Sequence, residues 1–468
     1  MKTADHSIHV AIIGAGIAGL ACANALSRVN HKVTVFEAEA DSQTQSTGGL
    51  RLAPNATKIL YHWGLAEQIK RVSFKSQAVT LNLYESGDLL GHHVWNEEII
   101  KETRGEYRCI GYNSLQKVLA DAALAAGASI RPKCRVVDID AEGKTLTLES
   151  GEVFFADMII GADGLAGVTS HLVVQERETQ DPLGLSVYNA YVPKATMLQH
   201  EDLAALFNDA RGSVTTWFGD SISAIGFRYG GPESSEGYTI QLFAPGDSQG
   251  TWQDAPKPES LDRMIASMAN ANPSLQKLMR LSTTPHHVPA SGSSLLDETE
   301  WVHDSGNVAV IGDAAHPLPV LVHPASMAIE DGAVLARLFL HLKNQEQIPS
   351  FLYAFQELRQ ARVKSIRDQE AGNLTFMMLP AGEMASYRDA DLRAKQAAGR
   401  NVLDPVSDAG DDDVSASLWQ EIKEQFGYDA EDEADNWWVN WGLLRERAKG
   451  NDHFSHNLQV QVAMVEAC

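Results

Sequence analysis

Three glycines and one carboxylate near the start of the chain have the spacing of a dinucleotide-binding turn. Gly14, Gly16 and Gly19 form a G-x-G-x-x-G pattern, and Glu37 follows in the same stretch. The first glycine permits a tight turn, the second lets backbone N–H groups approach a pyrophosphate, and the third lets a helix pack closely on a strand. Glu37 can accept hydrogen bonds from ribose hydroxyls, and an acidic residue there favours FAD or NAD over NADP.

The elements that must position these residues are a strand, a helix and a second strand. We expect them at 8–13, 17–29 and 32–36, which makes a βαβ unit with the glycines in its first turn. Farther on, the pattern predicts a hairpin over 78–95 and several β-rich runs between 184 and 243. The expected fold class is therefore α/β, with a Rossmann-like domain and a separate antiparallel or mixed β-sheet.

The charge and the cysteine content of the chain argue against several kinds of partner and ligand. Lys and Arg number 38 against 61 Asp and Glu, and the net charge of −23 argues against nucleic acid and anionic membranes. The four cysteines have no CxxC or other metal-ligand spacing, so we predict no metal site. The N-terminus lacks a signal-peptide pattern and the apolar run over 10–26 contains glycines, so we expect no membrane span and a cytoplasmic protein. The oligomeric state does not follow from the sequence.

Two further segments join the glycine turn in an order that resembles a known family. Gly161-Ala162-Asp163-Gly164 follows one predicted strand, and Gly312-Asp313-Ala314-Ala315-His316-Pro317 follows another. Together the three segments resemble the class A flavoprotein monooxygenases, particularly the fungal salicylate-hydroxylase-like branch. The resemblance implies FAD as cofactor, an FAD-binding domain assembled from discontinuous segments, and an inserted β-sheet domain that covers the flavin ring.

The resemblance and the expected elements also predict how the chain is divided. The FAD-binding domain is expected at 1–77, 106–180 and 291–378, a substrate-domain hairpin at 78–105, the β-sheet substrate domain at 181–290, and a helical or irregular C-terminal segment at 379–468. The hairpin and the sheet are both assigned to the substrate side.

The resemblance further implies where FAD is held and what it does. Asp313 is expected at the ribitol or pyrophosphate side of FAD, and the turn after Pro317 along the isoalloxazine. The full predicted cofactor set is Gly14, Gly16, Gly19, Glu37, Gly48, Gly49, Tyr112, Asp163, Asp313 and Ala325. Members of the family reduce FAD with NAD(P)H and form a flavin hydroperoxide. The implied reaction is hydroxylation or epoxidation of a small-molecule secondary metabolite, with NAD(P)H as reductant.

The chain departs from the family's pattern around the cofactor. Gly167 and Ser170 stand where the family has a serine and an arginine that organises the phosphate and nicotinamide side. Tyr112 takes the place of an arginine that supports FAD, and His323-Pro324 replaces a Gln-Gly pair in the turn beside the flavin. Because proline has no N–H, one donor to the pyrimidine edge is lost there. These changes remove groups that, in the family, support hydride delivery from NAD(P)H and stabilise the reduced flavin.

The residues of the predicted substrate pocket also differ from the family's pattern. Asn189 stands where the branch carries an arginine that holds a phenolate, and Phe227 where a tyrosine would align. Asn189 and Tyr191 should point to the same face of one strand by the period-two rule. We expect Tyr191, Trp217 and Phe227 to line the pocket.

Three residues are candidates for catalysis. Arg51 can hold a carboxylate or enolate oxygen with two parallel N–H donors, His323 can act as a general acid or base near neutral pH, and Asn189 lies in the same predicted pocket. Two alternatives to a monooxygenase stay open. One is a redox-neutral cyclase or isomerase on the same fold, with FAD structural or absent, and the other is a non-catalytic binding protein. The partner expected is a small molecule.

Overall fold

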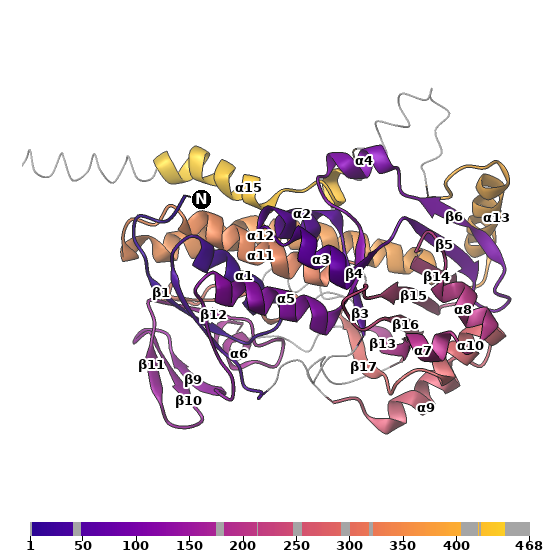
Figure 1. Cartoon of the computed structure of the whole chain (residues 1–468), viewed down its shortest axis with the longest axis horizontal. Coiled ribbons are helices and arrows are strands. Elements are labelled where there is room, and N and C mark those ends of the chain that lie inside the picture. Colours follow the sequence, from indigo (N-terminus) through magenta and orange to yellow (C-terminus); the bar gives the residue numbers. More distant parts are fainter. Residues whose placement is uncertain are drawn as a thin grey trace, which may run out of the picture.

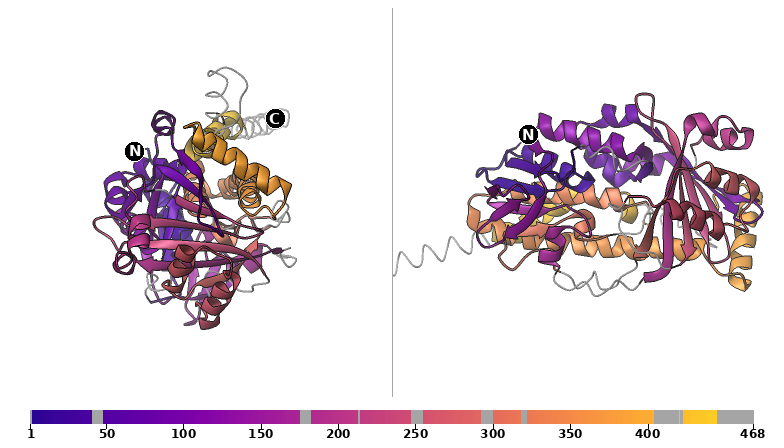
Figure 2. Two further views of the ribbon diagram at one scale, coloured as in Figure 1. Left: turned by 90° about the vertical axis from the view of Figure 1, so that its right-hand side faces the viewer. Right: turned by 90° about the horizontal axis from the view of Figure 1, so that it is seen from below.

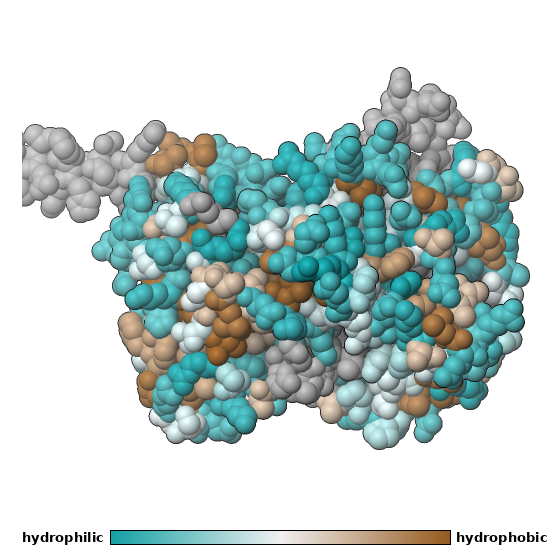
Figure 3. All heavy atoms as spheres, viewed as in Figure 1, coloured by the Kyte–Doolittle hydropathy of each residue, from teal (hydrophilic) through white to brown (hydrophobic). Residues whose placement is uncertain are grey.

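The structure is a computed structural model that describes residues 2–40, 48–174, 182–212, 214–246, 255–291, 300–317, 322–403, 420 and 423–444. The described residues form two lobes side by side, with one long helix running along both (Figure 1, Figure 2). One lobe holds a parallel sheet and the other a larger mixed sheet. On the face drawn in Figure 3, hydrophilic side chains cover most of the surface and apolar ones form small scattered groups, in keeping with the net charge of −23.

The parallel sheet has five strands in the order β18-β12-β1-β2-β8. The strands are β1 (His9–Ile13), β2 (Lys32–Phe36), β8 (Ser129–Arg131), β12 (Met158–Gly161) and β18 (Val308–Val310). Apolar runs such as "HVAII" and "MIIG" suit strands that are buried on both faces. Helix α1 (Ile17–Arg28) connects β1 to β2 and packs against helix α5 (Tyr112–Ala125). The predicted βαβ unit is confirmed.

Two small antiparallel sheets flank this core. The first consists of β9 (Val136–Asp140), β10 (Thr145–Leu148) and β11 (Val153–Phe155). The second has the order β3-β7-β4, with β3 (Gly49–Leu52), β4 (Ser73–Lys75) and β7 (Arg108–Gly111). Nearby helices are α2 (Pro54–His62), α3 (Ala66–Val72) and α6 (Val168–Val173). Strand β3 contacts the mixed sheet and so lies at the junction of the two lobes.

The mixed sheet has seven strands in the order β17-β13-β16-β15-β14-β5-β6. They are β5 (Ala78–Leu83), β6 (Leu89–Val94), β13 (Pro182–Pro193), β14 (Val214–Phe218), β15 (Ser223–Tyr229), β16 (Gly237–Pro245) and β17 (His286–Ser291). All neighbours are antiparallel except β14 and β5. The predicted hairpin therefore joins, through β14, a sheet formed by residues far along the chain.

Both faces of the mixed sheet are covered by apolar side chains. The outer face packs on the helices α7 (Lys194–Met197), α8 (Glu201–Phe207), α9 (Pro258–Ser267) and α10 (Pro273–Arg280). The inner face is turned to β3 and the long helices, and α4 (Glu97–Glu102) follows the hairpin. We use "inner face" and "outer face" for these two sides below.

Two helices, α11 (Pro324–Phe339) and α12 (Ile348–Met377), pack against each other, and α12 contributes side chains to the cores of both lobes. A short turn, η3 (Gly312–Ala314), precedes α11, and η4 (Gln345–Gln347) leads into α12. The chain continues with α13 (Glu383–Ala397), α15 (Ala430–Trp437) and the π-helical turn η5 (Trp438–Gly442). Although α12 has 30 residues, none of the helices in the described ranges is long and apolar enough to cross a bilayer. The expected α/β fold with an inserted mixed sheet and a C-terminal helical segment is confirmed.

Candidate functional site

The glycine turn after β1 has the geometry that the sequence pattern predicts. Gly14 adopts φ +102°, and a Cβ there would lie 2.4 Å from the carbonyl oxygen of Ala162. A Cβ on Gly19 would lie 2.0 Å from the carbonyl oxygen of Gly14, so only glycine lets α1 approach the turn this closely. At Gly16, by contrast, the nearest atom to an added Cβ is the hydroxyl of Tyr112 at 3.7 Å. Packing within the described residues therefore does not explain why position 16 is a glycine.

Glu37 directly follows the last residue of β2 and lies beside this turn. Its carboxylate accepts hydrogen bonds from the backbone N–H of Ala15 at 2.8 Å and of Glu39 at 2.9 Å. The carbonyl of Ala15 in turn accepts a hydrogen bond from the side chain of Gln116 in α5 at 2.8 Å. The acidic residue and the glycine turn are thus joined by direct hydrogen bonds.

Tyr112 lies at the first position of α5 and faces the same turn. Burial, together with the nearby carboxylates of Asp313 and Glu37, raises the pKa of its hydroxyl to about 12. The backbone N–H of Tyr112 donates to the carbonyl oxygen of Gly48 at 3.0 Å. Tyr112 therefore stands among four segments that were predicted to bind the cofactor, where it remains uncharged.

Asp163 serves the loop in which it lies. Its carboxylate accepts hydrogen bonds from the backbone N–H of Thr169 at 3.1 Å and from the hydroxyl of Thr169. Burial raises the pKa of Asp163, although these hydrogen bonds oppose the rise. A Cβ on Gly167 would lie 2.0 Å from the Asp163 carboxyl carbon, which explains the glycine at the position where the family has serine. The contacts of Asp163 are those of a residue that organises the start of α6.

The segment from Gly312 to His316 meets the glycine turn. Gly312 adopts φ +57°, and a Cβ there would lie 2.7 Å from the Cβ of Ala18 in the first turn of α1. Ser170 is buried and donates to the carbonyl oxygen of Ala314 at 3.3 Å. Asp313 lies in η3 between these contacts. Two predicted FAD segments that are distant in sequence therefore converge at the N-terminus of α1.

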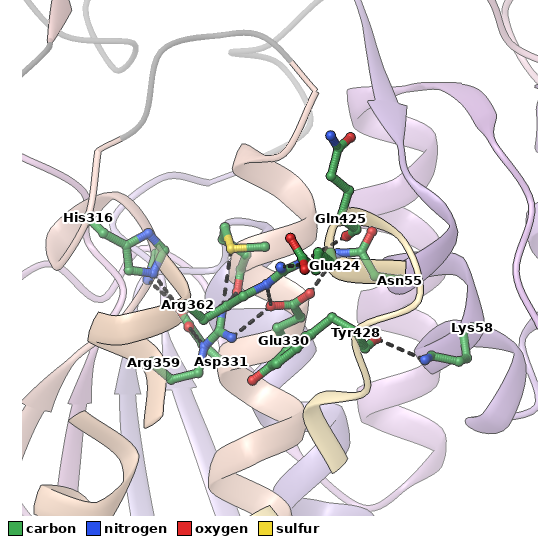
Figure 4. Close-up of polar contacts among 12 residues, drawn as sticks. Asn55, Lys58, His316, Glu330, Asp331, Arg359, Arg362, Glu424, Gln425 and Tyr428 are labelled. Atoms are coloured by element: carbon green, nitrogen blue, oxygen red, sulfur yellow. Dashed lines mark hydrogen bonds and ion pairs between the residues drawn. The ribbon is translucent and has the colours of Figure 1, made fainter. Parts of the chain in front are cut away.

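A buried ionic network lies beneath this segment (Figure 4). Asp331 accepts hydrogen bonds from His316 Nε2 at 2.7 Å and from the backbone N–H of Gly312 at 3.0 Å. Arg359 of α12 binds Asp331 with Nε at 2.8 Å and Glu330 with Nη1 at 2.7 Å. Burial by itself would raise the pKa of Asp331, but the charges of His316 and Arg359 outweigh it and hold the pKa at about 2.

The network extends to the C-terminal segment. Arg362 lies 3.6 Å from Glu330 and donates to the carbonyl oxygens of Glu424 and Gln425, and its guanidinium stacks on Tyr428 (Figure 4). On the opposite side, the amide of Asn55 donates to Glu330 at 2.6 Å. The sequence pattern did not single out Glu330, Arg359 or Arg362, because the network joins α2, α11, α12 and the C-terminal segment, which are distant in sequence.

The turn with His323-Pro324 is the start of helix α11. Pro324 occupies the first helical position, where its missing N–H would have no intrahelical acceptor. The first intrahelical bond runs from the Met327 N–H to the carbonyl of His323 at 2.8 Å, so the N–H groups of Ala325 and Ser326 point out of the helix end. The helix thus still presents two donors and its positive end. Proline removes one donor and leaves the rest of the arrangement in place.

Gly48 and Gly49 approach the inner face of the mixed sheet. A Cβ on Gly49 would lie 2.6 Å from the Cβ of Tyr229, and its N–H donates to the hydroxyl of Thr239 at 2.5 Å. Gly48 adopts φ +126°, with Asn189 and Tyr191 just beyond its position. Asn189 and Tyr191 therefore share the inner face, as the period-two rule predicts.

Arg51, two residues farther along β3, lies at the centre of a buried cluster. Its guanidinium is 5.2 Å from the ring centre of Phe227 and donates to Gln241 at 3.3 Å. It also makes a hydrogen bond with Tyr107, whose hydroxyl pKa is raised by burial and by the nearby charge of Glu370. We call Arg51, Tyr107, Phe227, Gln241, His323 and Glu370 the central cluster.

Trp217 does not lie with these residues. It packs in the apolar core on the outer face, whereas Phe227 and Tyr191 belong to the core on the inner face. Strand β14 is buried on both sides, so alternation along it does not reveal which side faces Arg51. The structure thereby corrects the predicted pocket: Tyr191 and Phe227 share a face, and Trp217 is on the other side of the sheet.

The described residues fit FAD at both ends of the predicted seat. At the pyrophosphate end, a Cβ on Gly16 would meet only the Tyr112 hydroxyl, and α1 begins with no side-chain cap, so its first N–H groups can receive phosphate. At the flavin end, the hydroxyl of Ser326 is buried, with no hydrogen-bond partner in the described part of the chain. Residues suited to hold FAD are therefore Gly16, Glu37, Asp313 and the first turn of α11.

Comparisons with known proteins agree with this geometry. Residues 7–370 match the family described as FAD binding domain. The FAD-dependent monooxygenase OpS4 of Beauveria bassiana (strain ARSEF 2860) is 28% identical over 408 residues, which cover 85% of this chain and 91% of that protein. The crystal structure of CtdE in complex with FAD and substrate 4 has a TM-score of 0.73 at 19% identity, covering 94% of this chain and 100% of that chain. A salicylate hydroxylase substrate complex has a TM-score of 0.65 at 21% identity, covering 92% and 97%.

Proposed function

The chain belongs to the FAD-binding-domain family of class A flavoprotein monooxygenases, and from this premise we propose that it oxygenates a small secondary metabolite with FAD. The observation that carries the proposal is the contact between Gly312 and Ala18, which brings the second FAD segment to the N-terminus of α1. The family match extends over both segments. FAD, when bound, supplies the reaction with dioxygen, and NAD(P)H is the reductant we expect.

The chain's own residues bind the cofactor and set the surroundings of the substrate. The helix ends of α1 and α11 direct N–H groups and partial positive charge toward the anionic parts of the cofactor. The inner face of the mixed sheet, with Phe227 and Tyr191, covers the other side and excludes water. Arg51 supplies a cation to the substrate from β3, whereas the family's pattern supplies one from the position of Asn189.

The test is to purify the protein, quantify its flavin and follow NAD(P)H consumption and peroxide release under air. We expect stoichiometric FAD that NAD(P)H reduces and dioxygen reoxidises. A colourless protein, or bound flavin that neither NADH nor NADPH reduces, contradicts the monooxygenase and favours the redox-neutral alternative.

A pair of glutamate variants supplies the control. Glu37→Gln should lower the FAD content, because the carboxylate that holds the turn and can accept from ribose is neutralised. Glu39→Gln, two residues on, changes an exposed carboxylate that pairs with Arg135 and should leave FAD content unchanged. Equal FAD loss in both would contradict the assignment of Glu37. The cytoplasmic location stays a prediction, to be checked by cell fractionation.

A further inference from the structure

One carboxylate oxygen of α12 holds the start of α11. Glu370 Oε1 accepts hydrogen bonds from the backbone N–H of Val322 and of His323, each at 2.8 Å, and lies 3.0 Å from Nδ1 of His323. The residues are deeply buried, with His323 3% and Glu370 1% exposed. Glu370 thus holds both the backbone and the ring of His323 in one orientation.

This contact selects one tautomer of His323. A carboxylate accepts hydrogen bonds and does not donate them, so Nδ1 of His323 carries the hydrogen. In the neutral ring Nε2 then has the free lone pair. Nε2 is buried and finds no hydrogen-bond partner in the ranges that the structure describes, while the ring stacks on Phe426 at 6.0 Å between centres. The lone pair of Nε2 is therefore held in one orientation, and none of the described residues uses it.

His323 and Arg51 are linked through Tyr107 within the central cluster. Tyr107 makes a hydrogen bond with Arg51 and lies near the charge of Glu370. Trp95 stacks on Tyr107 at 5.5 Å and touches Phe426 edge-on. The indole N–H of Trp95 and Oε2 of Glu370 are also buried without partners among the described residues. Several such polar atoms in one place point to a polar ligand, since buried polar groups are nearly always hydrogen-bonded.

We propose that His323 Nε2 is a general base that removes the proton from an acidic hydroxyl of the substrate, a phenol or an enol, and that Arg51 binds the resulting oxyanion. The O–H bond breaks, its electron pair stays on the substrate oxygen, and the proton forms the second N–H bond of the imidazole. Glu370 positions the ring and stabilises the imidazolium. The proton returns to the product oxygen before release. The assignment of this cluster to the substrate rests on the proposed function.

The inference accounts for Asn189. A neutral residue is tolerated at this position of β13 because the cation for an oxyanion stands on β3 instead, at Arg51. Burial raises the pKa of the neighbouring Cys109 thiol to about 12, so it stays neutral and does not compete for Arg51 as an anion. The substrate class is therefore one that gains reactivity toward oxygenation when its hydroxyl ionises, as electron-rich rings and enols do.

The test uses para-nitrophenol, whose anion is yellow, and the purified FAD-containing protein without NAD(P)H. At a fixed pH below the pKa of the free phenol, binding to the wild type should raise the anion-to-neutral ratio about tenfold, because the proton moves to His323 and the resulting imidazolium stabilises the anion by its charge. His323→Asn should lose most of this rise, because the site then has neither the proton acceptor nor the imidazolium, and only the charge of Arg51 remains. An asparagine amide can still donate to Glu370 and is a favoured residue at a helix start, so the fold is preserved.

The matched control is His287→Asn. His287 also has a buried Nε2 without a partner among the described residues, but it stacks on Tyr188 at the outer face. We expect it to ionise para-nitrophenol like the wild type. A wild type that does not favour the anion overturns the proposal, and so does a His323→Asn variant that ionises the phenol normally.

Glu370 is a positioning residue and needs a separate readout. In Glu370→Gln, the amide oxygen still accepts from the backbone, but the charge that supports imidazolium is gone, so ionisation of para-nitrophenol should fall while its binding remains. Glu370→Asp should restore part of the ionisation. Equal ionisation in both variants and the wild type contradicts this role. Because the assay needs neither NAD(P)H nor dioxygen, its failure is distinguishable from failure of the proposed function.

Discussion

Arg359 and Asp331 form an ion pair in which both side chains are completely buried, with Nε 2.8 Å from Oδ1. The pair joins α12 to α11, and Asp331 also binds the N–H of Gly312. The contact therefore helps to hold the predicted FAD segment that begins at Gly312. The same guanidinium also binds the neighbouring carboxylate of Glu330, so Arg359 is the cation for two buried carboxylates.

Replacing Arg359 by leucine should destabilise the protein strongly. Removal of one partner leaves the other charges buried without their main cation, which typically costs about 3–5 kcal/mol. The free energy of unfolding, measured by urea denaturation, checks this value. Arg337→Leu is the control, because Arg337 pairs with Asp435 from the same region but both side chains are about one-third exposed. We expect it to cost less than about 1 kcal/mol, and similar losses in the two variants would contradict the distinction.

His31 should make stability depend on pH. Burial lowers its pKa to about 4, in spite of a hydrogen bond to the carbonyl of Phe339. Nδ1 accepts from the N–H of Ile8, so the folded state holds the neutral ring. Between pH 6.5 and 4 the unfolded chain binds more protons than the folded one, so this contribution falls as pH falls, by roughly 3 kcal/mol in total.

The measurement for His31 is urea denaturation of the wild type and two variants across this range. His31→Gln should lose the part of the pH dependence that belongs to this ring. His171→Gln, at an exposed position of α6, should keep it. Parallel curves for wild type and His31→Gln would show that His31 is not the source.

Gly16 and Gly19 should respond differently to alanine. In Gly19→Ala the new Cβ would overlap the carbonyl of Gly14, so the βαβ unit should be destabilised with or without FAD. In Gly16→Ala the methyl group meets only the Tyr112 hydroxyl at 3.7 Å, so the apoprotein should melt like the wild type. FAD binding to Gly16→Ala should weaken about tenfold or more, equivalent to about 1.4 kcal/mol. Thermal melts of the apoproteins and flavin titrations check both statements, and unchanged FAD affinity in Gly16→Ala would contradict the assigned pyrophosphate site.

Pro324→Ala should act on the cofactor more than on the fold. Alanine is compatible with the first helical position and restores the N–H that proline lacks. The variant should keep its melting temperature within a few degrees while binding FAD more tightly or being reduced faster by NAD(P)H. If both cofactor properties are unchanged, the missing donor does not matter.

The glycine turn was predictable because it is local. A strand, a helix and a strand in sequence position Gly14, Gly16, Gly19 and Glu37, and each contact in the turn follows from that order. The family resemblance extended the prediction to Asp313 and Tyr112, which the structure brings to the same place.

The substrate side was less predictable because the mixed sheet is covered on both faces. Polar and apolar residues do not alternate along a strand such as β14, so its sequence does not tell an inward residue from an outward one. The sequence therefore does not show that Trp217 and Phe227 lie on opposite faces. Along β13 the prediction holds because a spacing of two residues places Asn189 and Tyr191 on one face, whichever face that is.

Glu370 and Tyr107 were missed because their roles depend on tertiary contacts. Glu370 lies in a long helix whose charges look like those of a solvated surface, and nothing nearby in sequence marks it as the partner of His323. Tyr107 precedes a short strand and shows no motif. No local signal would have found either residue, since both roles depend on which elements pack against them.

Helix α12 fixes the distance between two of its contacts with α11. Glu370 follows Arg359 by 11 residues, which is about three turns and roughly 16 Å, so both side chains lie on the same face; Arg359 binds the middle of α11 and Glu370 binds its start. One added residue between them would rotate Glu370 by about 100° relative to Arg359. The Arg359–Asp331 ion pair and the contact of Glu370 with His323 therefore both depend on the length of the helix between them. After an insertion or deletion in this stretch, only one of the two contacts can still form.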